Sequence, residues 1–138
     1  MTNASDYVIR ISKLANANRL YWSRIYYAKL RRNWTQGSKL IFLTKTSDSD
    51  ESFIGLGKIE VTYELSQLDL VEKRICIENN CQLKIVFSTM VRFIPAVRIN
   101  DVQQVWFNKI GGALLDGTHI SEAEISKIER LAKIMIIM

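Results

Sequence analysis

The segment from Arg19 to Lys45 combines basic and aromatic side chains and contains no Asp or Glu. Nine of the 19 Lys and Arg residues precede Thr46, whereas only one of the 14 acidic residues does. A field of one sign attracts polyanions. Aromatic rings stack on bases while Lys and Arg neutralise phosphates. The segment therefore predicts a nucleic-acid-binding surface, with six rings available to it: Tyr21, Trp22, Tyr26, Tyr27, Trp34 and Phe42.

These rings do not all have to face a ligand. We expect Tyr26, Tyr27 and Phe42 to belong to the core, whereas Trp22 and Trp34 are compatible with either a core or a stacking role. The sequence predicts phosphate contacts from the cations between them, which are Arg24, Lys29, Arg31 and Arg32.

Two other functions fit the same charge pattern. In the first, the basic face docks an acidic protein partner and the rings are all core. In the second, the protein is an enzyme that acts on a nucleotide-like small molecule. A catalytic role would need a base, and the one histidine, His119, follows the turn-like Asp116-Gly-Thr. We expect a loop histidine there and no catalytic residue.

No pattern calls for a metal or a cofactor. Cys76 and Cys81 stand five apart without a second cysteine pair, so we expect two ordinary, partly buried thiols. The glycines Gly55 and Gly57 lie within a predicted strand, where they indicate a bulge or a tight bend and not a phosphate-binding loop.

Composition places the chain among ordinary globular domains. It has 138 residues, of which 48% are hydrophobic and 24% charged, and no linker divides it, so we expect one domain over residues 1–138. The N-terminus lacks a signal-peptide pattern, and every apolar run is shorter than the roughly 18–20 residues that span a membrane. We therefore expect a soluble, cytoplasmic protein with no membrane partner.

In the first half of the chain, alternation predicts a strand over residues 6–12, and the asparagines at 16 and 18 predict a turn. A basic amphipathic helix is expected over 20–30. Strands over 39–45 and 53–64, joined by an acidic loop at 47–52, form an antiparallel hairpin.

In the second half, a helix is expected over 65–79 with Ser66 as N-cap, followed by a strand over 82–93. Pro95 ends this strand or makes it an edge, and 96–99 continues extended. A short helix over 100–107 would carry Trp106 inward, and Gly111-Gly112 is a break. Ser121 and Glu124 form a capping box that opens a helix through Lys133 with Ile125, Ile128, Leu131 and Ala132 on one face. The closing residues 134–138 are core or interface. This order predicts a small mixed α+β barrel.

Several short motifs resemble the PUA-like superfamily, and most closely its EVE and YTH branches. They are Tyr21-Trp22-Ser23 with the basic stretch after it, KLIFLTK, a polar loop, FIGLGKIEV, Arg92-Phe-Ile-Pro95, the Gly111-Gly112 loop and the closing helix. The resemblance implies a small β-barrel decorated with helices. It also implies recognition of RNA, favoured over DNA, or of a modified base, in some members within an aromatic cage.

By this resemblance Trp22 is the candidate for a cage wall and Ser23 for a polar contact to the base. Trp34 matches no family motif, so its candidacy rests on the basic segment alone. The GxKxxExR motif of the related ASCH domains is absent. Its absence weakens any transfer of that branch's activities to this chain.

Overall fold

The computed structural model describes residues 6–46, 51–102 and 116–138. These contain seven strands: β1 (Asp6–Ile11), β2 (Ile25–Ala28), β3 (Lys39–Lys45), β4 (Glu51–Glu64), β5 (Leu83–Arg98), β6 (His119–Ile120) and β7 (Ile134–Ile137). They also contain the helices α1 (Leu14–Ser23), α2 (Leu70–Glu78) and α4 (Glu122–Leu131), with short 3₁₀ turns η1 (Leu65–Gln67) and η2 (Ile99–Asp101). None of the described helices is long and apolar enough to cross a membrane.

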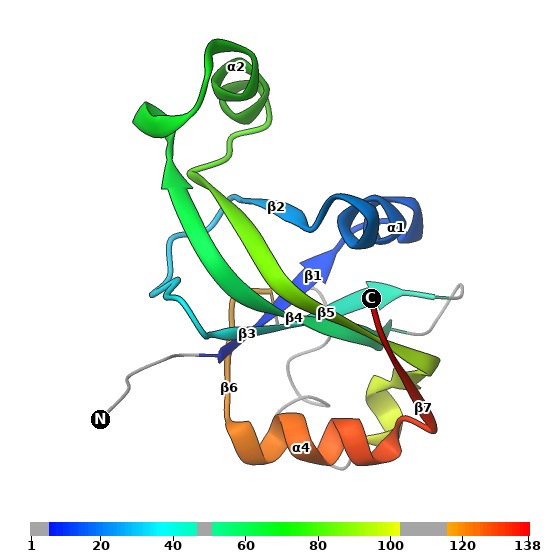
Figure 1. Ribbon diagram of the computed structural model, residues 1–138. Coiled ribbons are helices and arrows are strands. Elements are labelled where there is room, and N and C mark those ends of the chain that lie inside the picture. Colours follow the sequence, from blue (N-terminus) through cyan, green and yellow to red (C-terminus); the bar gives the residue numbers. More distant parts are fainter. Residues whose placement is uncertain (1–5, 47–50, 103–115) are drawn as a thin grey trace.

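All seven strands form one mixed sheet in the order β2-β5-β4-β3-β1-β6, with β7 also paired to β5 (Figure 1). β1 and β3 are parallel, and the other pairings are antiparallel. β2 and β7 occupy successive parts of the same edge of β5, because β4 pairs along the other edge. The long β4–β5 hairpin carries α2 at its tip, away from the body of the sheet (Figure 1).

The curled sheet buries a core on each of its faces. Alternate side chains of β1 point to opposite faces. Tyr7 and Ile9 therefore join a cluster that α1 covers with Ala17, Leu20 and Tyr21. Val8 joins the second cluster, which α4 covers with Ile125 and Ile128. The fold is thus the small α+β barrel with attached helices that the element order predicted.

The capping box of α4 is confirmed. Ser121 Oγ accepts from the Glu124 N–H, and a Glu124 carboxylate oxygen accepts from the Ser121 N–H. Ile125 and Ile128 are buried as expected, but Leu131 at the last turn of the helix is 44% exposed.

The hairpin of β3 and β4 is also confirmed, and its register shifts between Phe42 and Leu43, opposite the segment that contains Gly55. The predicted bulge near these glycines is therefore present. β4 begins two residues earlier than expected, so Glu51 and Ser52 belong to the strand and not to the acidic loop.

The predicted basic helix over 20–30 is wrong. α1 spans Leu14–Ser23 and includes the two asparagines that were expected to form a turn. It ends at Arg24, whose backbone is left-handed (φ 60°), and β2 follows directly. Ile25, Tyr26 and Tyr27 suit a strand, since β-branched and aromatic side chains pack well on a pleated surface. Their pairing with β5 decides the conformation.

Pro95 does not end its strand. β5 runs on to Arg98, and Pro95 lies where its pairing with β4 is irregular, between the Gly55–Arg92 and Phe53–Val97 pairs. The predicted helix over 65–79 is divided into η1 and α2, and Asp69, not Ser66, caps α2 by accepting from the Glu72 N–H. The expected helix over 100–107, with Trp106, and the Gly111-Gly112 break fall largely outside the described residues.

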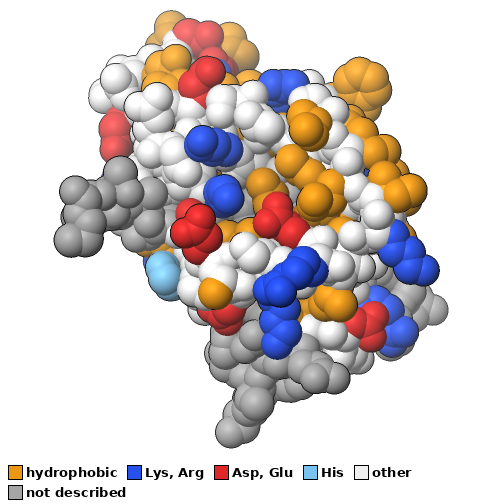
Figure 2. All heavy atoms as spheres, turned by 60° about the horizontal axis from the view of Figure 1, so that its bottom comes forward, with side chains coloured by type: hydrophobic (Ala, Val, Ile, Leu, Met, Phe, Trp, Pro, Cys, Tyr) orange, Lys and Arg blue, Asp and Glu red, His pale blue; other side chains and the backbone are white. Residues whose placement is uncertain are grey.

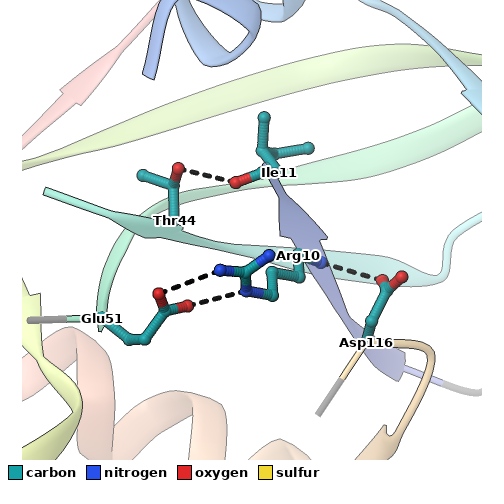
Figure 3. Close-up of polar contacts among 5 residues, drawn as sticks. All are labelled: Arg10, Ile11, Thr44, Glu51 and Asp116. Carbon is teal, nitrogen blue, oxygen red and sulfur yellow. Dashed lines mark hydrogen bonds and ion pairs between the residues drawn. The ribbon is translucent and has the colours of Figure 1, made fainter. Parts of the chain in front are cut away.

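Polar contacts hold the frame at the ends of β1 and β3 (Figure 3). The guanidinium of Arg10 pairs with both carboxylate oxygens of Glu51, at 2.9 and 3.1 Å, and its backbone N–H donates to Asp116 at 2.9 Å. The Thr44 hydroxyl donates to the Ile11 backbone oxygen at 2.7 Å. These contacts tie β1, β3, β4 and the turn before β6 together beside the point where Thr46 leaves β3.

At the tip of the hairpin, Glu72 attaches α2 to the sheet. It accepts from Tyr27 Oη at 2.8 Å and pairs with Lys84 Nζ at 2.7 Å. The Lys84 ammonium and the Tyr27 hydroxyl hold the pKa of Glu72 below its ordinary value of 4.5. Burial, followed by Glu72, raises the pKa of Tyr27 to about 12.

We expect Glu72→Gln to lower the free energy of unfolding by about 1 kcal/mol near neutral pH. Because the folded-state pKa is depressed, this stabilisation is complete above the ordinary carboxyl pKa and is lost as the pH falls through the folded value. Denaturant unfolding should therefore show the two proteins converging in acid. Glu78→Gln, at an exposed position of the same helix, is the control, and a gap that stays constant down to acid pH would contradict the prediction.

Candidate nucleic-acid interface

A pocket of about 320 Å³ opens between α1 and the outer half of β5. One wall comes from α1, a second from the ends of β3 and β4, and a third from the strand around Pro95. The lining residues are Ala17, Asn18, Tyr21, Thr46, Ile54, Arg92, Phe93, Ile94, Pro95 and Ala96. A mostly apolar cavity with a few converging polar groups is the usual form of a small-ligand site, and its volume is large enough for a nucleobase.

Tyr21 and Arg92 make up one part of this lining. The Tyr21 side chain is buried, and its hydroxyl lies 3.0 Å from the backbone oxygen of Ile54 and 3.3 Å from that of Val91, to which it donates. The guanidinium of Arg92 lies 5.6 Å from the centre of the Tyr21 ring. Burial raises the pKa of Tyr21 well above its ordinary value, so the hydroxyl stays neutral. The phenol therefore fixes the end of α1 against β4 and β5, and Arg92 is held over its ring.

The remaining polar groups of the pocket can form hydrogen bonds with the edge of a planar ligand. The Asn18 amide offers both a donor and an acceptor, and Arg92 offers only donors. Thr46 offers a hydroxyl, which lies 3.0 Å from Ser52 Oγ. None of these groups is a base at neutral pH, so the arrangement is suited to binding.

Trp22 is the most exposed large hydrophobic residue of the described chain, at 89%. It does not line the pocket, but it follows Asn18 by four residues on α1. Side chains four apart lie on the same side of a helix, and helical side chains lean toward the N-terminus. Helical spacing therefore places Trp22 on the same side of α1 as Asn18, which lines the pocket, and its ring is almost fully exposed.

Ser23 and Arg24 have local roles. The Ser23 hydroxyl contacts the backbone N–H and oxygen of Ile25, where the chain passes from α1 to β2. Arg24 lies where β2 and β7 meet along β5, and its guanidinium donates to the backbone oxygens of Ser88 at 2.9 Å and Met138 at 2.6 Å. Arg24 thus fills a gap in the strand pairing, and in this structure its charged end is committed to backbone oxygens.

The other predicted cations are spread over the surface. Arg32 Nε donates to the Gly117 backbone oxygen at 2.8 Å, which holds the turn before β6. Arg31 makes an exposed pair with Glu64 at 3.4 Å. Lys29 is exposed just after β2. The basic segment therefore does not form one helical face, because β2 separates Arg24 from the other three.

Trp34 is a core residue. It is 9% exposed, its Nε1 donates to the Leu30 backbone oxygen at 3.0 Å, and its ring packs edge-on against Tyr7 at 5.0 Å between centres. This packing leaves Trp34 no free face for stacking, so the structure does not support it as a base contact. Phe42 is fully buried, and Tyr26 packs against the same cluster, as expected for core rings. Tyr27 was expected in the core as well, but it is half-buried, and its hydroxyl donates to Glu72 because β2 places it beside α2.

His119 and the two cysteines lie apart from the pocket. His119 is exposed on β6 with its ring edge-on to Tyr7 at 5.9 Å. Cys76 and Cys81 are free thiols, and both are buried more completely than the sequence suggested.

No protein-family model and no curated protein matches the chain. Solved structures match it over nearly the whole length. ASCH from Zymomonas mobilis has a TM-score of 0.61 at 10% identity, covering 93% of this chain and 96% of that one. A point variant of the same protein gives 0.63 at 10% identity, covering 96% and 100%. The YTH domain of Zygosaccharomyces rouxii MRB1, in complex with N6-methyladenosine RNA, gives 0.53 at 16% identity, covering 94% and 86%.

The protein has a PUA-like fold. The resemblance to the superfamily, drawn from short motifs, is thereby confirmed for the fold, and the ASCH structures give the higher TM-scores. A special relation to the EVE branch stays a prediction.

Within this fold, the sequence did not identify most of the residues that line the pocket. In the sequence, Asn18 falls in a predicted turn, Tyr21 is one of several rings, and Thr46 belongs to no motif. The sequence signal for these residues is Arg92-Phe-Ile-Pro95, which resembles a motif of the superfamily but names no site by itself. Arg92 and Pro95 both line the pocket.

Proposed function

We propose that this domain binds nucleic acid by holding a single base in the pocket between α1 and β5, with Trp22 stacking at the mouth. The observation that carries the proposal is the exposed Trp22 ring one helical turn beyond Asn18, which with Thr46 and Arg92 supplies the polar lining of the cavity. The YTH domain with a similar fold was solved with N6-methyladenosine RNA, which favours RNA and a modified base as the ligand here.

The chemistry of the pocket suits an unstacked base. Sequence-specific RNA recognition works on bases that are splayed out, stacked on aromatic rings and hydrogen-bonded along their edges. The Asn18 amide and the Arg92 guanidinium would read such an edge, while Ile54, Pro95 and Ala96 exclude water from its faces. Each stacked base contributes about 1–3 kcal/mol.

The flanking phosphates would meet cations close to the pocket. Arg19 follows Asn18, Lys45 precedes Thr46, and both side chains are exposed. The sequence predicted phosphate contacts from four cations. Two of them, Arg24 and Arg32, donate to backbone oxygens, which leaves Lys29 and Arg31 as the candidates for phosphate contacts. Arg24 and Arg32 support the fold, so their loss would alter stability as well as binding.

We expect Trp22→Ala to weaken binding of single-stranded RNA about 5- to 150-fold, the equivalent of 1–3 kcal/mol, with little change in unfolding free energy. Fluorescence anisotropy with labelled RNA, with and without N6-methyladenosine, measures the affinity at several salt concentrations. Leu70→Ala, an exposed apolar residue on α2, is the matched control.

Two results would overturn the proposal. One is the absence of salt-sensitive binding to any RNA or DNA by the wild-type protein. The other is equal affinity of the Trp22→Ala and wild-type proteins. Binding of an acidic protein with no affinity for oligonucleotides would instead select the protein-docking alternative.

A further inference from the structure

β7 is an apolar edge strand with exposed side chains. Ile134, Met135, Ile136 and Ile137 are 56%, 48%, 41% and 75% exposed, and the run contains no charge. Figure 2 shows hydrophobic side chains gathered on the right-hand side of the molecule, the side on which β7 runs in Figure 1. Exposed apolar edges invite pairing with another strand, and proteins normally protect them with charges or prolines. β7 has neither.

Along its outer edge, the backbone of β7 pairs with no other strand of the described residues. Among the described residues, β5 is the one strand paired with it, in an unbroken antiparallel register from Ile134–Ile94 to Ile137–Val91. The Met138 N–H donates to the Met90 oxygen at 2.8 Å. Hydrogen-bonded pairs alternate along an antiparallel ladder. The N–H groups of Ile136 and Ile134 therefore point toward β5, whereas those of Met135 and Ile137 point outward.

We propose that β7 pairs with β7 of a second copy of this chain, antiparallel and about a two-fold axis at Ile136. In this register Met135 of each copy lies opposite Ile137 of the other. These are the two residues whose N–H and C=O groups point outward, so each such pair forms two hydrogen bonds. Ile136 faces its own counterpart across the axis as a non-hydrogen-bonded pair.

A second copy fits this edge better than an unrelated partner does. A two-fold interface is self-complementary, and an antiparallel strand pair centred on one residue satisfies that condition automatically. The uncharged run offers nothing to an acidic protein or to a phosphate backbone. The exposed area of β7, Met138 and Ile94 is on the order of 600 Å² per copy, so a pair would bury at most about 1,200 Å², the lower limit for stable interfaces.

This pairing would also place the two pockets on one face of the joined sheet. Ile136 and Ile134 lie opposite Arg92 and Ile94, both of which line the pocket. A two-fold axis perpendicular to the sheet keeps equivalent faces on the same side. If the proposed function holds, one strand of RNA can reach both sites and gain affinity through effective concentration. The dimer itself does not depend on that function.

Sedimentation equilibrium of the full chain tests the proposal directly. The wild-type protein is expected to be a dimer, and Ile136→Lys, which sets two ammonium groups against each other at the axis, is expected to be a monomer with an unchanged circular-dichroism spectrum. Leu70→Lys, at an exposed apolar site on α2, should remain dimeric. A monomeric wild-type protein, or a dimer that survives Ile136→Lys, overturns the proposal.

Cross-linking tests the register without relying on an introduced charge. Non-hydrogen-bonded pairs bring Cα atoms to about 4.5 Å, which lies within the range that a disulfide spans. Mild oxidation of Ile136→Cys should give a covalent dimer on a non-reducing gel. Ile134→Cys should not, since that position faces Met138 of the second copy. Both variants keep the buried Cys76 and Cys81, so those thiols are matched. Equal cross-linking of the two variants, or none in either, contradicts the register.

Discussion

Gly55→Ala is expected to lower the free energy of unfolding by about 3 kcal/mol or more. At Gly55, β4 closely approaches both β5 and the Tyr21 side chain of α1. A Cβ on Gly55 would overlap the Tyr21 hydroxyl and the backbone oxygen of Val91. Backbone cannot move aside as a flexible side chain does. The substitution would therefore displace Tyr21 and break the hydrogen bonds that hold α1 to the sheet. Urea unfolding followed by circular dichroism measures this loss.

Two companion variants separate the causes. At Gly37 a Cβ meets nothing within 4 Å, but the backbone has a φ of +89°. Gly37→Ala should therefore cost only the conformational penalty of about 1–2 kcal/mol. Adding Tyr21→Phe to Gly55→Ala removes one overlap and should restore part of the stability. If Gly55→Ala is no worse than Gly37→Ala, the close approach at Gly55 is not what determines its cost.

Phe42→Ala is expected to lower the free energy of unfolding by about 3–5 kcal/mol. Phe42 is fully buried, and its ring packs edge-on against Tyr21 at 6.0 Å and against Phe87 at 5.6 Å between centres. Truncation leaves a cavity next to Tyr21, which lines the pocket. The variant should therefore also weaken ligand binding at temperatures where it is still folded. Thermal and chemical denaturation give the stability, and the anisotropy assay gives the affinity.

The control for Phe42→Ala is the same kind of truncation at the surface. Trp22→Ala removes a larger ring but should change stability by less than about 0.5 kcal/mol, because Trp22 is exposed. Phe42→Leu fills most of the cavity and should recover much of the loss. A cost of less than 1 kcal/mol for Phe42→Ala would show that the core around Tyr21 repacks freely.

The elements predicted best are those whose signals are local. KLIFLTK is a strand with the predicted boundaries, and the Ser121–Glu124 capping box starts α4 as expected. The strand is specified by the residues within it, and the helix is specified by the capping residues in its first turn. A single sequence contains all of that information.

The elements predicted worst are those that long-range pairing decides. Residues 25–28 have apolar spacing that fits a helix, yet they form β2 because β5 offers them a partner more than 50 positions away. Pro95 disrupts an isolated strand, but an irregular stretch of the β4 pairing accommodates it. The residues next to such a segment in the sequence do not indicate which distant strand it will pair with.

The candidate site shows the same division. By itself the sequence determined which types of side chain are present near the N-terminus: an excess of cations, several aromatic rings and the Trp22-Ser23 pair. Only the tertiary structure decided which of these groups are available. Trp34 became core and Arg24 a link between β2 and β7, while Asn18, Tyr21 and Arg92, from distant segments, came to line one pocket. Residue types set what a side chain can bind, but its exposure and neighbours depend on contacts between segments far apart in the chain.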